Sequence, residues 1–151
     1  MKPVNIQRWA SSERHDEIMA MIHAAFADFT PPSGVLKETA ADLAQRQRDG
    51  FVLVAMENDG FIGSVFCAVK DNSLYLTRMA TRPDRWGDGI GRAMLRACED
   101  EARKLGLPRL SLRVRKTLPG NLDYFARFGF VVIGEGQEGG RTPFDVMEKR
   151  L

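Results

Sequence analysis

The chain has 151 residues, of which 44% are hydrophobic and 28% charged, a composition that predicts a folded domain with a buried core rather than disorder. Its formal net charge is only +2, so the overall charge does not favour a nucleic-acid partner. The first five residues contain no apolar export signal, and no apolar run approaches the roughly 20 residues of a membrane helix. We therefore expect one cytoplasmic domain over residues 1–151, with neither nucleic acid nor membrane as a partner.

The two cysteines, Cys67 and Cys98, lie in apolar runs and outside the spacings of metal sites. We expect both to be small buried side chains in a reducing compartment, and we expect no metal site.

The N-terminal third predicts one strand and two helices. Residues 4–8 favour a short edge strand. Paired serines and an early acid then start an amphipathic helix that continues to Phe29. A segment with two prolines and a glycine, residues 30–34, separates it from a second helix expected over 37–49.

The middle of the chain predicts three strands in a meander. Residues 51–56 form a continuous apolar run, and Asn-Asp-Gly at 58–60 is a strong hairpin signal. A strand over 61–69 pairs back, and a second turn at 71–73 leads to a strand over 74–81.

A glycine-dense turn then precedes a helix with one apolar face up to Leu105, which a glycine and a nearby proline end. Residues 110–114 favour a strand, so strand, helix and strand predict a right-handed crossover and a parallel pair. We expect a short helix over 121–128, a strand over 130–134, a glycine-rich loop over 134–143 and a last strand over 144–151. The order of elements predicts an α/β (α+β) fold, with a mixed, twisted sheet of about seven strands and helices on both faces.

The turn over residues 85–92 has the composition of a phosphate-binding site. Its glycines allow the backbone to approach an anion, and the following helix N-terminus supplies unpaired N–H donors. Arg82, Arg85 and Arg92 add local positive charge. The turn lacks the Gly-Lys-Ser/Thr ending of a nucleoside triphosphate loop, and Arg92 stands where a dinucleotide fingerprint needs its third glycine. A plain connecting loop remains an alternative at this point, as does a nucleotide-binding domain.

The stretch from Leu76 to Leu95 resembles motif A of the GNAT superfamily of N-acyltransferases. The family pattern is Arg/Gln-x-x-Gly-x-Gly/Ala after a strand and a proline, and Gly89 and Gly91 match it. Trp86 occupies the Arg/Gln position, with an arginine one place earlier.

A second segment, residues 121–130, resembles motif B of the same family, Asn-x-x-Leu-Tyr-x-x-Leu-Gly-Phe. Phe125 occupies the tyrosine position and Tyr124 precedes it. The order of elements is similar to the family's along the whole chain, so the resemblance covers essentially all of it.

The resemblance implies an acetyl-CoA-dependent N-acetyltransferase that transfers its acyl group directly to a primary amine. The alternative is a non-catalytic domain that binds acyl-CoA as a sensor or accessory. Tyr124 is the candidate acid for the departing thiolate. The residues expected to bind coenzyme A are Met79, Ala80, Thr81, Arg85, Trp86, Gly87, Asp88, Gly89, Ile90, Gly91, Arg92, Asn121 and Phe125. Of these, Met79 to Thr81 are expected to lie at a strand bulge that frees N–H groups for the pantetheine arm and the thioester carbonyl. Asn121 has a helix N-cap as its alternative role.

The acceptor side is less defined. Arg113 and Arg115 can bind an acidic acceptor or remain solvated, and the segments 29–37 and 134–143 are the expected acceptor loops. His15 and His23 are expected on a helix face rather than in catalysis. The last strand is expected to be exposed and able to pair in a homodimer. Candidate general bases, chosen by approximate location alone, are Glu38, Asp71, Tyr75, Glu135 and Glu138.

Overall fold

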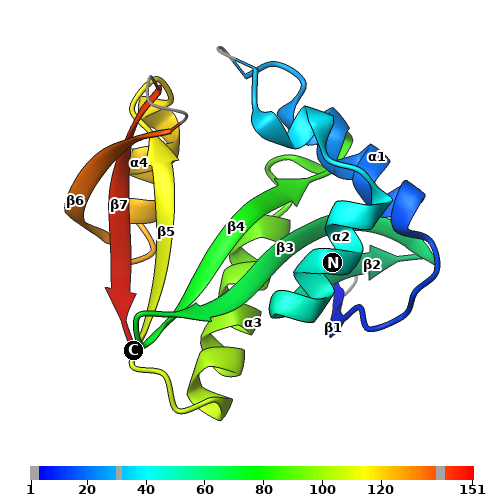
Figure 1. Cartoon of the computed structure of the whole chain (residues 1–151), viewed down its shortest axis with the longest axis horizontal. Helices are drawn as coiled ribbons and strands as arrows, with labels where there is room; N and C mark the ends of the chain where they lie inside the picture. Colours follow the sequence, from blue (N-terminus) through cyan, green and yellow to red (C-terminus); the bar gives the residue numbers. More distant parts are fainter. Residues whose placement is uncertain (1–3, 30–31, 139–141) are drawn as a thin grey trace. The chain divides into compact units, whose positions relative to one another are not determined.

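The computed structural model describes residues 4–29, 32–138 and 142–151. In these residues seven strands form a sheet in the order β1-β2-β3-β4-β5-β7-β6, accompanied by four α-helices (Figure 1). The mixed sheet expected from the sequence is thus confirmed. Contacts group the chain into two compact units, residues 1–68 with 76–98, and residues 69–75 with 99–151. Each unit has its own packing.

The first unit contains the N-terminal half of the chain and the beginning of the long third helix. Its elements are β1 (Asn5–Arg8), α1 (His15–Phe26), the 3₁₀ turn η1 (Gly34–Lys37), α2 (Ala40–Asp49), β2 (Phe51–Glu57), most of β3 (Gly60–Lys70) and of β4 (Ser73–Thr81), the 3₁₀ turn η2 (Pro83–Arg85) and the first residues of α3 (Ile90–Lys104).

Helices cover both faces of the sheet in this unit, as expected (Figure 1). Because successive strand residues point to opposite faces, Val52 and Val54 of β2 pack in the cluster that contains the buried residues of α1 and α2. Ala55 packs instead in the cluster that contains Ile90 and Met94 of α3. The continuous apolar run of β2 therefore results from burial on both sides.

Two local predictions can be compared with the structure. Asn58 and Asp59 both have positive φ, 51° and 64°, as the predicted Asn-Asp-Gly hairpin turn requires. The first helix, in contrast, begins later than its serines suggested. Arg14 is its N-cap, in the left-handed region and without a side-chain cap hydrogen bond, while Ser11 Oγ accepts from the backbone N–H of Glu13. The helix ends at Phe26 rather than at Phe29.

The second unit contains β5 (Arg109–Arg115), α4 (Pro119–Ala126), β6 (Val131–Glu138) and β7 (Thr142–Arg150), together with the start of β4 and the end of α3. The start of β4 pairs in parallel with β5, Leu74 opposite Leu110, which confirms the predicted parallel pair. Leu110, Leu112 and Val114 of β5 are buried in alternation, and β5 pairs antiparallel with β7.

The expected loop over 134–143 is largely a hairpin instead. β6 continues to Glu138, and Gly134 and Gly136 pair with Val146 and Phe144 of β7. The Phe144 ring covers Gly136, where a Cβ atom would lie 2.7 Å from its Cζ. A glycine under a cross-strand aromatic ring is compatible with a strand, although glycine content alone suggested a loop. Residues 139–141 lie outside the described part of the chain.

The position of the last strand also differs from the prediction. β7 lies between β5 and β6 in the sheet, so β6 is the edge strand. Val131, Val132 and Ile133 of β6 are 59%, 50% and 55% exposed.

Both cysteines are buried and unbridged, with their Sγ atoms 3.9 Å apart, which confirms the prediction of small buried side chains. No helix in the described residues has the length and apolar character needed to cross a membrane.

Candidate functional site

The glycine-rich turn lies between β4 and α3, in the first unit. Gly87 and Gly89 have φ values of +87° and +81°, a region that residues with a Cβ atom rarely adopt. A Cβ atom built at either position would meet nothing within 4 Å. The backbone conformation, rather than a lack of space within the protein, is therefore what requires glycine here.

The turn leads directly into the N-terminus of α3. The N–H of Ala93 donates to the carbonyl of Gly89 at 3.1 Å, so the N–H groups of Ile90 and Gly91 lie in the first turn, ahead of the regular helical hydrogen bonds. Ile90 is 2% exposed and anchors this end against Ile62 and Met94. The result is a fixed set of backbone donors at the positive end of a helix dipole, which fits a pyrophosphate group.

Arg85 holds this turn in place through carboxylates. Its guanidinium donates to both carboxylate oxygens of Glu57 at 2.7 and 3.2 Å, and to Asp88 Oδ2 at 2.7 Å. These hydrogen bonds, first to Glu57 and then to Asp88, raise the pKa of Arg85 above its usual range. From the sequence, Arg85 and Asp88 are both expected to contact the ligand. In the structure, Arg85 is paired with Asp88 and with Glu57, the last residue of β2. Arg92 is exposed on the first turn of α3.

Trp86, the departure from the family pattern, ties the turn back to β4. Its indole N–H donates to the carbonyl of Thr81 at 2.8 Å, and its ring remains 59% exposed. This hydrogen bond to the Thr81 carbonyl fixes the position of Trp86 beside the glycine turn.

β4 contains a left-handed residue close to where the sequence predicted a bulge. Arg78 has φ 52°, one residue before the predicted segment Met79 to Thr81. A left-handed conformation occurs in one class of β-bulge, so Arg78 is compatible with the predicted bulge. The next two residues pack toward opposite faces, Met79 against the α3 cluster and Ala80 in the α1–α2 cluster.

The motif B residues lie on α4, in the second unit. Tyr124 packs edge-on against Phe125 and Phe128, with ring centroids 5.2 and 5.0 Å away, and Phe125 packs against Phe130. Asn121 is exposed within the helix, whose N-cap is Leu118, so the alternative role of Asn121 as an N-cap is wrong.

The candidate bases do not lie together. Glu135 receives a hydrogen bond from Lys116 Nζ at 2.6 Å, which lowers the pKa of its carboxyl. Asp71 is exposed in the β3–β4 turn, and the side chain of Tyr75 lies between two cations, Lys70 and Arg113. Glu138 has no described side chain.

Among the candidate bases with described side chains, Glu38 lies beside the left-handed residue of β4. Its carboxylate accepts two hydrogen bonds from Arg78, at 3.2 and 3.1 Å. His23, which the sequence placed on a helix face without a role, has its Nε2 3.0 Å from the backbone carbonyl oxygen of Glu38. The sequence did not predict that Arg78 and Glu57 belong to this region. Their partners, Glu38 and Arg85, lie far away in the sequence, so no local pattern connects them.

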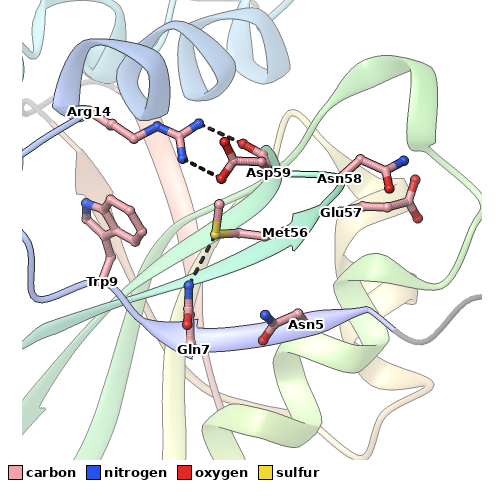
Figure 2. A pocket seen from close by; sticks show the side chains of 8 residues that line it. All are labelled: Asn5, Gln7, Trp9, Arg14, Met56, Glu57, Asn58 and Asp59. Carbon is pink, nitrogen blue, oxygen red and sulfur yellow. Dashed lines mark hydrogen bonds and ion pairs between the residues drawn. The ribbon is translucent and has the colours of Figure 1, made fainter.

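A hollow of about 530 Å³ opens beside the β2–β3 turn, in the first unit (Figure 2). Figure 2 shows Trp9 and Arg14 on one side and Gln7, which donates to Met56 Sδ, on the other. Its lining residues are Asn5, Gln7, Trp9, Arg14, Met56, Glu57, Asn58 and Asp59. None of the predicted coenzyme A residues lines it. Among the described residues, no group of His, Cys, Asp or Glu side chains is arranged to hold a metal ion.

One family profile matches the chain. The profile of the Acetyltransferase (GNAT) family matches residues 10–130. A sequence comparison with curated proteins gives no match.

Several solved structures share the fold. The ribosomal-protein-S18-alanine N-acetyltransferase of Escherichia coli is 21% identical, with TM-score 0.76 over 98% of this chain and 94% of that chain. The PaiA N-acetyltransferase of Thermoplasma acidophilum, solved in complex with coenzyme A, is 18% identical, with TM-score 0.79 over 99% and 100% of the two chains. Ard1 of Thermoplasma volcanium is 13% identical, with TM-score 0.83 over 98% and 97%. Since the family profile spans most of the sequence, the chain belongs to the GNAT family of acetyltransferases.

Proposed function

We propose that this protein transfers an acetyl group from acetyl-CoA to the nitrogen of a primary amine. The observation that carries the proposal is a run of positive-φ residues between β4 and α3. Arg78 lies in β4, and Gly87 and Gly89 lie in the turn that leads to the N-terminus of α3. Family membership adds acetyl-CoA as the acyl donor.

The turn and the first N–H groups of α3 are proposed to bind the pyrophosphate. Positive φ at Gly87 and Gly89 turns the backbone so that its N–H groups can surround an anion. Arg85 contributes by fixing the turn to Glu57 rather than by contacting phosphate, since its guanidinium already has two carboxylate partners. Arg92 is the cation of this region whose exposed position suits a phosphate contact.

The thioester is proposed to lie along β4 after Arg78. A left-handed residue is typical of one class of β-bulge, where strand pairing is locally disrupted, and we expect an N–H of Met79 or Ala80 to donate to the carbonyl oxygen of the acetyl group. Such a donor stabilises the negative charge that develops on this oxygen during attack. The amine nitrogen forms the new C–N bond, the C–S bond breaks, and the amine gives up a proton while the departing thiolate gains one.

Tyr124 is proposed to supply the proton to the thiolate. The supporting observations are its phenol and its fixed position among Phe125 and Phe128. Phe125, at the family's tyrosine position, lacks a proton to give.

Two further proposals concern the setting of the reaction. Buried, unbridged Cys67 and Cys98 fit a reducing compartment, so we expect a cytoplasmic protein. A homodimer through β6 is supported by the three exposed aliphatic residues of this edge strand, because an unpaired strand edge is a template for pairing with another copy.

The test is to incubate the protein with acetyl-CoA and a panel of primary amines, including amino acids, polyamines and peptides with free N-termini, and to follow thiol release. Calorimetry with coenzyme A, NAD and ATP is run in parallel. Thiol release with at least one amine, and binding of coenzyme A in preference to NAD and ATP, are expected. Binding without thiol release from any amine would indicate an acyl-CoA-binding domain, and absence of coenzyme A binding would overturn the site itself.

A further inference from the structure

Arg78 is held in an unfavourable backbone conformation at the point where β4 enters the proposed site. It has a φ of 52° within the strand Ser73–Thr81. Residues with a Cβ atom rarely adopt this backbone conformation, and it persists only where the surrounding structure stabilises it. Something other than the local sequence must therefore stabilise this conformation.

The side chain of Arg78 is bound by the carboxylate of Glu38. Arg78 Nε lies 3.2 Å from Glu38 Oε1, and Arg78 Nη2 lies 3.1 Å from Glu38 Oε2. This is the paired geometry in which guanidinium and carboxylate bind most specifically. The two side chains are 23% and 17% exposed, so water competes only weakly for them.

A second arginine uses the same carboxylate. Arg46 Nη2 lies 3.7 Å from Glu38 Oε2, while its Nη1 lies 3.4 Å from Thr77 Oγ1. Its guanidinium also lies over the Phe66 ring of β3, 5.3 Å from the ring centre. The carboxylate of Glu38 therefore contacts two guanidiniums. One belongs to Arg78 itself, and the other, of Arg46, contacts the preceding strand residue, Thr77.

Glu38 is itself fixed by backbone contacts. Its N–H donates to the carbonyl of Val35 at 2.9 Å, and its own carbonyl oxygen lies 3.0 Å from Nε2 of His23 on α1. The next residue, Thr39, begins α2 with a capping box to Asp42. A carboxylate on such an anchored backbone can impose a position on Arg78 rather than follow it.

We propose that Glu38 is a positioning residue of the acetyltransferase site, which keeps Arg78 left-handed so that the backbone N–H groups of Met79 and Ala80 remain available to the thioester. The inference rests on the proposed function, because it assigns Glu38 a role in that site. It also gives Glu38 a role other than that of a general base, since its carboxylate is bound to guanidiniums rather than open to an amine.

The first experiment compares Glu38→Gln with wild type. The substitution keeps the side-chain shape but removes the charge between Arg78 and Arg46. We expect kcat to fall about tenfold, equivalent to about 1.4 kcal/mol, with little change in the KM for acetyl-CoA, because the pyrophosphate turn is untouched.

The chain supplies a matched control. Arg14 is also a left-handed arginine, with φ 64°, and it is also held by a glutamate, Glu17, at 2.7 Å. It lies at the start of α1 rather than in β4. Glu17→Gln removes an ion pair of a left-handed arginine that lies outside the proposed site, although this pair is more exposed and Arg14 also binds Asp59, and it is expected to leave kcat and both KM values unchanged.

The decisive variant is Arg78→Gly. Glycine adopts positive φ without support, so in this background the strand no longer needs the carboxylate. Glu38→Gln is then expected to lower kcat by less than twofold further. A full tenfold loss in the Arg78→Gly background would mean that Glu38 acts on a substrate, and the positioning role would be overturned. An unchanged kcat for Glu38→Gln in the wild-type background would overturn it as well.

A measurement independent of activity separates this proposal from the proposed function. Hydrogen exchange at the amides of residues 77–81 is expected to accelerate in Glu38→Gln and to remain unchanged in Glu17→Gln. If the wild-type protein acetylates no amine but this exchange pattern appears, the proposed function fails while the structural role of Glu38 stands. Unchanged exchange in Glu38→Gln would refute the structural role directly.

Discussion

Gly89→Val tests the assignment of the pyrophosphate turn most directly. From the sequence, the glycines of this turn are expected to let the backbone approach an anion, and a branched side chain would occupy that space. The structure adds a different cost, because Gly89 has φ +81° while a Cβ atom there meets no neighbouring atom within 4 Å. The penalty therefore lies in the backbone rather than in a clash with the protein.

The magnitude follows from this conformation. A residue with a Cβ atom in the left-handed region costs about 1–2 kcal/mol. The variant can keep the turn and lose this much stability, or it can relax the turn and withdraw N–H donors from the ligand. Together with the side chain's own bulk on the ligand side, we expect the Kd for coenzyme A to rise at least tenfold, about 1.4 kcal/mol.

The assay is titration calorimetry with coenzyme A, accompanied by denaturant unfolding of each variant. Gly106→Val is the matched control, since Gly106 also has positive φ (+71°) with no neighbour within 4 Å of a Cβ atom. It follows the opposite end of α3, where its N–H donates to the carbonyl of Arg103. We expect similar losses of stability in the two variants but a change of Kd only in Gly89→Val. An unchanged Kd in folded Gly89→Val, or equal changes in both variants, would refute the placement of the pyrophosphate.

Three other predictions concern the second unit. Tyr124→Phe should lower kcat by about 10²-fold with little change in coenzyme A affinity if the phenol is the acid; steady-state kinetics with full activity would leave the ring only its packing against Phe125. Lys116 lowers the pKa of Glu135, so this pair contributes stability above the ordinary carboxyl pKa of 4.5 and loses it as the pH falls through the lower folded value. Glu135→Gln should therefore show a smaller drop in unfolding free energy between neutral and acidic pH, measured by denaturant titration, and an equal drop would contradict the pairing. Val132→Lys places a charge on the exposed edge strand β6 and should convert a dimer into a monomer in analytical ultracentrifugation; a wild-type monomer, or a variant dimer, would exclude this edge as the interface.

Much of the fold was predictable because its signals are local. Asn58 and Asp59 adopt the left-handed conformations that their hairpin turn requires, and this preference belongs to the residues themselves. The positive φ of Gly87 and Gly89 in the turn before α3 is likewise a conformation that glycine itself favours. The order of strands and helices followed from hydrophobic period and turn residues, and the two motif segments, residues 76–95 and 121–130, indicated the family.

The same local reasoning failed where a partner from another strand changes the meaning of a residue. Gly134 and Gly136 suggested a loop, but pairing with β7 and the covering ring of Phe144 make them part of a strand. The position of β7 inside the sheet could not be predicted either, because a strand's sequence does not state which neighbours it will have.

By itself the sequence determined most of the elements, the glycine turn and the family, since each of these depends on residues that are neighbours along the chain. Only the tertiary structure decided what holds the site in shape. Arg85 meets Glu57 across 28 positions of sequence, and Arg78 meets Glu38 across 40. Ion pairs between segments this far apart in sequence follow no period and no spacing rule, because they depend on where two side chains end in space, and folding alone brings the members of each pair together.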